Sequence, residues 1–329
     1  IRTGEPVANA FRKCPNLVME PPNHKMYSIY SRKLMEFLVS YTPDIEQVSV
    51  DECYMDFTGI AGNYHSPIDA AVEIKNAIYE KFGFTVNIGI SNNKLLAKMA
   101  SDFEKPNKVH TLFPQEIPVK MWPLPVSELY MAGKASVAVL KKLEIQTIGE
   151  LAQMEPHLLE LHLKSHGRML WEFANGIGDA TIHAEESAAK GIGNSTTLSR
   201  DATTEEEAKK VLLWLRKAKQ KAGMVSVEIK YHDFRTASHQ KQLIQNTNSE
   251  QLLYENACAL FRELWNGEPI RLLGIRTSKL VEESAPEQLT IFDIQPEKQK
   301  DEKQRKLEKA LDDIRRRFGE DAVKRGRFL

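Results

Sequence analysis

The order of periodic segments between residues 192 and 281 is the feature that most restricts the fold. Apolar and polar side chains alternate over residues 225–231, as a half-buried strand requires, and apolar side chains recur at three- and four-residue spacing in two other segments, as helices require. The β-α-β-β-α-β order predicts a split βαβ sandwich whose sheet has one open face. The expected strands cover 193–199, 225–231, 238–244 and 271–280, and the expected helices cover 204–222 and 249–265.

The first 115 residues also mix helices and strands, and they predict an α+β sheet layer. The last of three expected helices follows Ser91 or Asn92, either of which can cap its first turn. The expected helices cover 26–41, 66–82 and 93–103, and the expected strands cover 46–50, 53–58, 84–90 and 109–113.

The remaining segments are separated by changes in composition. Prolines are frequent from 114 to 125 and mark a boundary. Residues 126–180 carry short helical runs and little strand signal, and the small, polar residues 184–190 are typical of a linker. Residues 282–299 are polar and predict a flexible tail.

Charge and cysteine content exclude several classes of protein. Lys and Arg together number 45, as do Asp and Glu, so the zero net charge gives no global sign of a nucleic-acid partner. Residues 190–281 nevertheless hold 15 basic and 10 acidic side chains. Three cysteines without CxxC spacing exclude a disulfide framework and a cysteine-based zinc site. No apolar run approaches the roughly 18 residues of a membrane span. Because the cysteines form no disulfide framework, we expect a reducing, intracellular environment.

The sharpest local signal is the run SVDECYMD at residues 49–56, where Asp51 and Glu52 lie between two expected strands. Such a strand end can present both carboxylates to one cleft. Carboxylate oxygens are the ligands that Mg²⁺ prefers, usually one or two of them together with substrate phosphates. A solvated turn is the alternative, and the pair alone does not decide between the two.

A second signal is GISNNKLLAKMASDFEKPN at residues 89–107, in which an expected strand runs into a helix start. The free amides of a helix start favour anions, and Lys105, on a Lys-Pro turn, is able to reach a phosphate. The alternative is a solvated lysine after a helix, and the segment alone favours that alternative.

Taken together, VSVDECYMDFTG and GISNNKLLAKMASDFEKPN resemble the bacterial branch of the Y-family DNA polymerases, the low-fidelity enzymes of lesion bypass. The resemblance extends over essentially the whole chain. It implies an α+β, right-hand polymerase with partial fingers, a ferredoxin-like palm, a helical thumb that resembles a helix-hairpin-helix, and a little finger. The implied ranges are 1–22 for the remnant of the fingers, 23–115 for the palm, 116–183 for the thumb, 184–191 for a linker, 192–281 for the little finger and 282–329 for a C-terminal tail.

The resemblance also implies an activity and its residues. Asp51 and Glu52 match the carboxylates that bind the catalytic metal, with two Mg²⁺ ions expected, and Lys105 matches the lysine that contacts the incoming triphosphate. Ser49 and Asp56 fit the same signature, and we assign them structural roles. The implied reaction is template-directed transfer of a nucleotide from a deoxynucleoside triphosphate to a primer 3′-hydroxyl. The implied location is the bacterial cytoplasm, at the nucleoid, without a membrane partner.

The thumb is expected to contact primer-template DNA through a hairpin loop. Gly133 and Lys134 lie in this loop, where backbone amides can approach a phosphate. The sequence departs from the family at two positions, because Met131 and Glu144 stand where the family usually has glycine.

The little finger is expected to contact the DNA backbone. Arg271 and Arg276 match family arginines with this role. The basic excess of the region supports it, because phosphate contacts give an affinity that does not depend on sequence. Without the resemblance, a solvated basic face would be the simpler interpretation. The additional DNA-binding residues expected in or beside the strands are Lys230, Arg235, Lys241 and Lys279.

A clamp-binding peptide is expected in the tail, where Gln288, Leu289, Ile291 and Phe292 form the run QLTIF. Apolar side chains in a flexible segment have no core to join, which indicates a docking peptide. The run resembles the peptides by which bacterial polymerases bind the sliding clamp. An extra strand packed on the little finger is the alternative.

The family's first palm strand, with a further metal-binding aspartate, would precede Ile1, as would an aromatic steric gate and a Tyr/Arg pair of the fingers. We therefore expect these 329 residues alone to be inactive and the full-length protein to be the enzyme. The alternative from another class is a non-catalytic DNA- and clamp-binding protein with a polymerase fold. A nucleotidyl cyclase would share the metal-binding palm, but it explains neither the basic region nor the tail.

Overall fold

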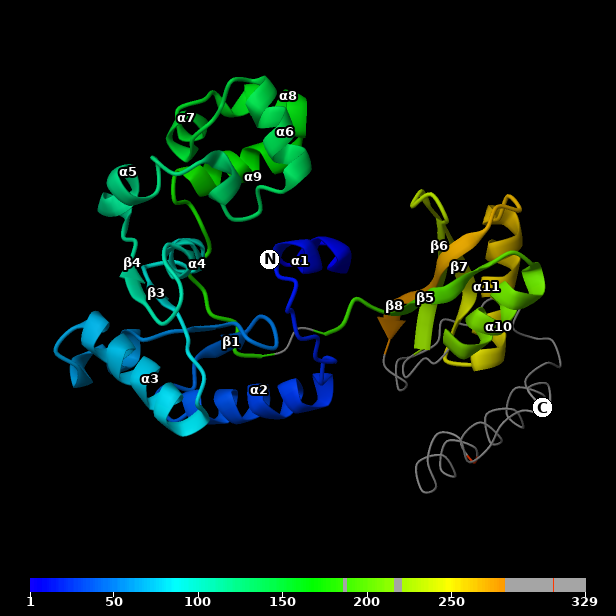
Figure 1. Cartoon of the computed structure of the whole chain (residues 1–329), viewed down its shortest axis with the longest axis horizontal. Coiled ribbons are helices and arrows are strands. Elements are labelled where there is room, and N and C mark those ends of the chain that lie inside the picture. Colours follow the sequence, from blue (N-terminus) through cyan, green and yellow to red (C-terminus); the bar gives the residue numbers. More distant parts are fainter. Residues whose placement is uncertain (186–187, 216–220, 282–309, 311–329) are drawn as a thin grey trace. The chain divides into compact units, whose positions relative to one another are not determined.

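Figure 1 shows the computed structural model of the chain, which describes residues 1–185, 188–215, 221–281 and 310. The chain divides into two compact units, Ile1–Glu186 and Ser187–Leu329. The division falls inside the stretch that the sequence indicates as a linker. Among the described helices, none is both long enough and apolar enough to cross a membrane.

The second unit is a four-stranded antiparallel sheet with two helices on one face (Figure 1). The expected β-α-β-β-α-β order is confirmed, and the strands lie in the order β5-β8-β6-β7. Its elements are β5 (Gly191–Ala202), α10 (Glu205–Leu215), β6 (Lys221–Tyr231), β7 (Thr236–Thr247), α11 (Glu250–Leu264) and β8 (Ile270–Val281).

The core of the second unit lies between the sheet and the helices α10 and α11. Val225, Val227 and Ile229 of β6 are fully buried there beside Phe261 of α11. The expected helix over 204–222 is wrong at its end, because residues from Lys221 onward belong to β6. Ala222, which fits the helical spacing, instead pairs with Thr247 and Leu280 in the ladder. Tertiary strand pairing on both sides outweighs a local helical pattern.

The first unit contains a mixture of short strands and helices, as expected for an α+β fold. Its elements up to residue 111 are α1 (Val7–Lys13), α2 (His24–Leu38), β1 (Ile45–Gln47), β2 (Cys53–Met55), the 3₁₀ helix η1 (Thr58–Asn63), α3 (Pro67–Phe82), β3 (Ile88–Ile90), α4 (Lys94–Asp102) and β4 (Val109–Thr111). Short helices follow, namely η2 (Pro114–Glu116), α5 (Ile117–Lys120), η3 (Val126–Glu128), α6 (Lys134–Lys142), α7 (Ile148–Ala152), α8 (Pro156–Leu163) and α9 (Ser165–Ala174).

The strands of the first unit form two separate pairs rather than the single layer that we expected. β1 and β2 are antiparallel, whereas β3 and β4 are parallel. All four are also shorter than their apolar patterns predict. The chain turns at Val48 and Ser49, whose amides both donate hydrogen bonds to the carbonyl of Glu52. An alternating pattern reports which side chains are buried, whereas a strand also needs a backbone partner at each residue.

Two apolar cores hold the first unit together, and α4 contributes to one of them. Helices α2 and α3 bury Leu34 and Ile74 against the β1 side. Leu96 and Met99 of α4 pack with the helices that follow residue 114. Asn93, rather than Ser91 or Asn92, caps α4, since its side chain accepts a hydrogen bond from the Leu96 amide at 2.8 Å.

Gly89 of β3 allows α4 to lie directly against the strand. A Cβ atom at this position would be 1.8 Å from the carbonyl oxygen of Ala97 and 2.6 Å from the amide nitrogen of Ser101. Both are backbone atoms of α4, so no side-chain movement could make room. The absence of a side chain at Gly89 therefore sets the distance between strand and helix.

We expect Gly89→Ala to lower the free energy of unfolding of the first unit by about 1–3 kcal/mol or more, because α4 must move away from β3. Urea denaturation followed by circular dichroism measures the change. Gly59→Ala is the matched control, since a Cβ there meets no atom within 4 Å. Equal effects of the two substitutions would contradict the role of Gly89.

Candidate active site

Asp51 and Glu52 lie in the tight turn that joins β1 to β2, and both are exposed. The turn is closed by the amides of Val48 and Ser49, which donate to the Glu52 carbonyl at 2.9 and 3.2 Å. The pairing of Gln47 with Cys53 at the base of the turn fixes its register. The two neighbouring carboxylates are thus presented together at the end of a strand pair.

The Ser49 side chain organises this turn. Its hydroxyl donates to Oδ1 of Asp51 at 2.7 Å and accepts from the Glu52 amide at 3.1 Å. These bonds agree with the structural role expected for Ser49. Asp56 has a similar local role, because its carboxylate accepts a hydrogen bond from the Thr58 amide at 2.8 Å. Hydrogen bonds from the Thr58 side chain and backbone hold the pKa of Asp56 below its ordinary value.

The structure links Glu52 to Lys105 through two residues of α4. Lys98 Nζ donates to Oε1 of Glu52 at 2.6 Å and lies 3.4 Å from Oδ2 of Asp102. Lys105 Nζ lies 2.7 Å from Oδ1 of the same Asp102. We call Glu52, Lys98, Asp102 and Lys105 the charge chain, because positive and negative groups alternate along it.

Burial and charge have opposite effects on the charge chain. Burial alone would lower the pKa of Lys98, but its hydrogen bond to Glu52 and the charges of Asp102 and Glu52 raise that pKa overall. Burial alone would raise the pKa of Asp102, but the hydrogen bond from Lys105 and the charge of Lys98 lower it. All of these shifts favour the charged forms.

Sequence reasoning identified both ends of the charge chain and missed its middle. The available signal was spacing, because Lys94, Lys98 and Asp102 are four residues apart and so share one face of α4. Lys94 uses that position differently from Lys98. Its ammonium contacts Glu46 at 3.0 Å and Asp179 at 2.9 Å, which ties the segment after α9 to α4.

The donor set of the turn fits a hard cation. Asp51 and Glu52 supply only oxygen atoms, and Mg²⁺ commonly uses one or two carboxylates together with substrate phosphates. The neighbouring Cys53 does not suit a metal, because burial raises the pKa of its thiol to about 11 and keeps it protonated. Over the described part of the chain, no group of three or more His, Cys, Asp or Glu residues is placed to hold a metal ion, so the candidate ligands are the two carboxylates of the turn.

Met131 and Glu144, which lie before and after α6, adopt backbone conformations that glycine would favour. Met131 has a φ of 68° and Glu144 a φ of 64°, at the two positions where the family usually has glycine. Both positions therefore adopt a positive φ without glycine. Gly133 is the residue before α6, Lys134 is the first residue of that helix, and both are exposed.

The open face of the second unit carries some of the expected DNA-binding residues. Ser226 of β6 pairs with Arg276 of β8, and Lys230 lies on the same face as Ser226. Lys279 donates to the Gln242 side chain at 2.9 Å, and Gln242 pairs with Met224 on that face.

The other expected residues of the second unit lie elsewhere. Lys241 pairs with Val225, which is buried under the helices, so Lys241 belongs to the helix-bearing face. Arg235 forms ion pairs with both Asp233 and Glu268 in a turn. The guanidinium of Arg271 lies 4.8 Å from the centre of the Phe234 ring. The structure therefore separates the six basic residues that the sequence grouped together.

The clamp-binding peptide expected at Gln288, Leu289, Ile291 and Phe292 lies outside the described residues.

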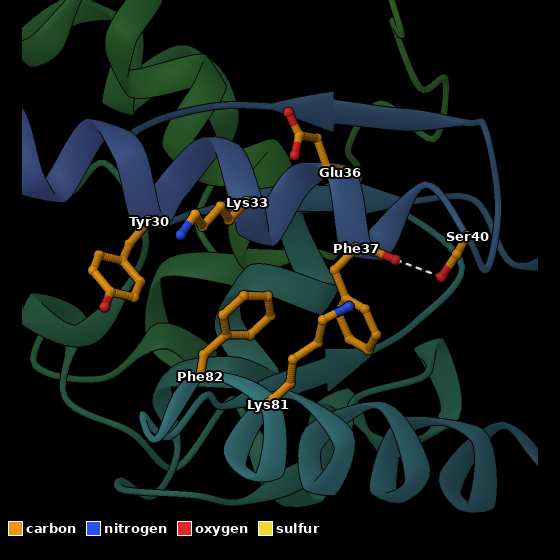
Figure 2. Close-up of a pocket in the computed structure, with 7 residues that line it drawn as sticks. All are labelled: Tyr30, Lys33, Glu36, Phe37, Ser40, Lys81 and Phe82. Atoms are coloured by element: carbon orange, nitrogen blue, oxygen red, sulfur yellow. Dashed lines mark hydrogen bonds between the residues drawn. The ribbon is translucent and has the colours of Figure 1, made fainter.

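A pocket of about 480 Å³ opens between α2 and α3 (Figure 2). Lys81 lies over the Phe37 ring at 4.3 Å, and Lys33 lies 5.5 Å from the Tyr30 ring centre. Glu36 is the only carboxylate among its lining residues. Because it lacks paired carboxylates, this pocket does not offer the chemistry of the β1–β2 turn.

Comparison with known proteins identifies the family. The model of the impB/mucB/samB family matches residues 1–102, and the model of its C-terminal domain matches residues 189–291. These ranges cover more than half of the chain. The chain belongs to the impB/mucB/samB family.

Individual relatives of this impB/mucB/samB protein agree with that assignment. It is 42% identical over 337 residues to DNA polymerase IV of Clostridium acetobutylicum, an alignment that covers 100% of this chain and 84% of that protein. It is 35% identical over 339 residues to DNA polymerase IV 1 of Bacillus subtilis, with 100% and 81% coverage.

A solved structure of a chimera of the Y-family DNA polymerases Dbh and Dpo4 is 25% identical, with a TM-score of 0.75. The match covers 86% of this chain and 84% of the chimera. The resemblance to Y-family DNA polymerases and the expected α+β polymerase fold are therefore confirmed. Polymerases of this family are generally metal-dependent.

Proposed function

We propose that the full-length protein acts as a lesion-bypass DNA polymerase. In that reaction a nucleotide is transferred from a deoxynucleoside triphosphate to a primer 3′-hydroxyl opposite a template, and pyrophosphate is released. Relatives named DNA polymerase IV support the enzyme over the non-catalytic alternative and over a nucleotidyl cyclase. The observation that carries the proposal is the charge chain. It connects Glu52, a carboxylate suited to binding a metal, with Lys105, a lysine suited to binding a phosphate, in one contiguous site.

Asp51 and Glu52 are the proposed metal ligands, and two Mg²⁺ ions are the proposed occupants. Bound Mg²⁺ supplies Lewis-acid activation of the attacking oxygen and neutralises charge on the leaving phosphates. The protein's own residues orient these ligands. Ser49 fixes the Asp51 carboxylate by a hydrogen bond at 2.7 Å. Lys105, whose side chain is 58% exposed, offers its ammonium to the incoming triphosphate.

The two units have different proposed roles. In the first unit, residues 23–115 are the palm and residues 116–183 the thumb, whose Gly133 and Lys134 contact a DNA phosphate. In the second unit, residues 192–281 are the little finger. Its DNA surface is the open sheet face with Lys230, Arg276 and Lys279, which are grouped by the ladder. Primer-template DNA bound there would locate the enzyme at the bacterial nucleoid.

The proposed additional partner is the bacterial sliding clamp. The proposal rests on the sequence QLTIF at residues 288–292, where Leu289, Ile291 and Phe292 supply apolar groups and Gln288 a hydrogen-bonding group. Such short peptides bind with apolar anchors in a pocket of the partner.

We expect Asp51→Ala and Glu52→Ala, made separately in the full-length enzyme, each to abolish primer extension while leaving DNA affinity nearly unchanged. Each substitution removes a ligand of the reacting centre but no phosphate contact. Primer extension on a labelled template and fluorescence anisotropy measure the two quantities. Glu73→Gln, an exposed carboxylate of α3, is the control and should extend normally. Extension at the normal rate by either site variant would contradict the assignment.

We expect the double substitution Lys230→Ala with Arg276→Ala to weaken binding to unrelated DNA sequences by the same factor. The slope of log affinity against log salt should shrink by about 0.9 for each lost phosphate contact on duplex DNA. Lys241→Ala should leave the slope unchanged, because Lys241 lies on the helix-bearing face. A larger effect of Lys241→Ala than of the double substitution would show that DNA does not use the open face.

We expect Ile291→Ala with Phe292→Ala to remove clamp binding and clamp-stimulated synthesis in the full-length enzyme, yet leave synthesis without the clamp intact. Each apolar side chain is worth roughly 1.5–3 kcal/mol on burial, before the cost of ordering the peptide. Micromolar affinity, about −8 kcal/mol, is therefore expected for the peptide. Surface plasmon resonance on immobilised clamp measures it. If the double variant unfolds instead, these residues belong to the little-finger core.

A further inference from the structure

Lys98 and Asp102 have no assigned role, although they stand between the two ends of the active site. Lys98 is held by Glu52 at 2.6 Å and by Asp102 at 3.4 Å. Asp102 in turn holds Lys105 at 2.7 Å. Lys98 and Asp102 each therefore have two partners of opposite charge. A change in ion pairing at one end of the charge chain alters the ion pairing at the other end.

The Lys98 ammonium would compete with a metal ion for the Glu52 carboxylate. Its ammonium donates to Oε1 of Glu52, so that oxygen is already neutralised before any divalent cation arrives. A cation at Glu52 repels the Lys98 ammonium, because like charges a few ångströms apart in a partly buried site interact strongly. The Lys98 side chain is 18% exposed and already touches Asp102, so the displaced ammonium has a ready acceptor.

Asp102 holds the Lys105 ammonium in an ion pair, as Glu52 holds the Lys98 ammonium. While Asp102 shares its charge with Lys98 only at 3.4 Å, it binds Lys105 more closely, at 2.7 Å. When Lys98 moves fully onto Asp102, the carboxylate is neutralised and its hold on Lys105 weakens. The Lys105 ammonium is then available to another anion.

We propose that Lys98 and Asp102 are positioning residues that couple cation binding at Glu52 to release of Lys105 for the triphosphate. The inference rests on the proposed roles of Glu52 and Lys105 and adds an order to them. Before the cation binds, Lys105 is held by Asp102. After it binds, Lys98 transfers from Glu52 to Asp102 and Lys105 is freed. No proton is transferred and no covalent bond is made or broken, because only ion pairs are exchanged.

The first test is the affinity of the full chain for Mn²⁺, followed by electron paramagnetic resonance without DNA or nucleotide. Lys98→Met should tighten Mn²⁺ binding about fivefold or more, the lower range of typical coupling between sites, because a competing cation is removed. Lys98→Arg should restore the original affinity. Lys94→Met is the matched control, since that lysine lies one turn earlier on α4 and pairs with Glu46 and Asp179 instead.

The second test is binding of a fluorescent deoxyadenosine triphosphate in the presence of EDTA. Asp102→Asn should tighten binding severalfold, because Lys105 is freed, and Lys98→Met should weaken it. The gain from Asp102→Asn should disappear in a Lys105→Met background, which a general charge effect would not produce. Glu104→Gln is the control, since Glu104 pairs with Lys108 at 3.0 Å.

The two tests separate the inference from the proposed function. If Glu52→Ala abolishes Mn²⁺ binding but Lys98→Met leaves the affinity unchanged, the coupling is wrong and the metal site stands. If Glu52→Ala and the parent chain bind Mn²⁺ equally, or neither binds it, the metal site is wrong and the inference fails with it. If Asp102→Asn gains the same affinity with and without Lys105, Asp102 does not act through Lys105.

Discussion

The contact between β3 and α4 at Gly89 determines where the charged groups of the active site can lie. Because Gly89 has no side chain, the backbone of α4 lies directly against the strand. One face of α4 then buries Leu96 and Met99 in the helical core. The face with Lys94, Lys98 and Asp102 is left to meet Glu46 and the β1–β2 turn. Separation of strand and helix would break the charge chain without altering any charged residue.

In the second unit, pairing between strands has the same controlling role. A residue of an antiparallel sheet lies on the same face as its ladder partner, so the register decides which basic side chains can act together. Arg276 lies beside β5, where Gly191 and Gly193 leave room for it. A Cβ at Gly191 would be 3.0 Å from Nε of Arg276. Small residues on the neighbouring strand thus let a long arginine lie along the sheet.

Much of the fold and part of the candidate site could be predicted from the sequence, because periodicity and local motifs report burial and chain turns directly. The β-α-β-β-α-β order and the adjacent carboxylates of the turn were predicted in this way. Strand lengths were not, since a ladder depends on backbone partners distant in sequence, as Ala222 illustrates. The face of Lys230 followed from the alternation over residues 225–231, but the face of Lys241 was not predicted. It depends on the register of β7 against β6, and a count of basic residues contains no register.

The middle of the active site was missed for a related reason. Lys98 and Asp102 are ordinary residues of a charged helix face, and four-residue spacing between such residues is common. Their role depends on Glu52, which contacts Lys98 only when β1, β2 and α4 are assembled. Glu46 gives a second example, because it accepts from the His183 amide at 2.9 Å across more than a hundred residues of chain.

Backbone packing at Gly89 and the ion pairs of the charge chain differ in energy, and each energy suits a different role. Overpacking at Gly89 would be costly because backbone meets backbone. Ion pairs between partly exposed groups contribute little, typically below about 1 kcal/mol. The side chains of Glu52 and Asp102 are 49% and 45% exposed, so the charge chain adds little to folding stability. Weak pairs can be exchanged at little cost, whereas the packed helix beneath them stays in place. An ion-pair exchange on a rigid helix therefore moves charge across the active site without requiring the fold to change.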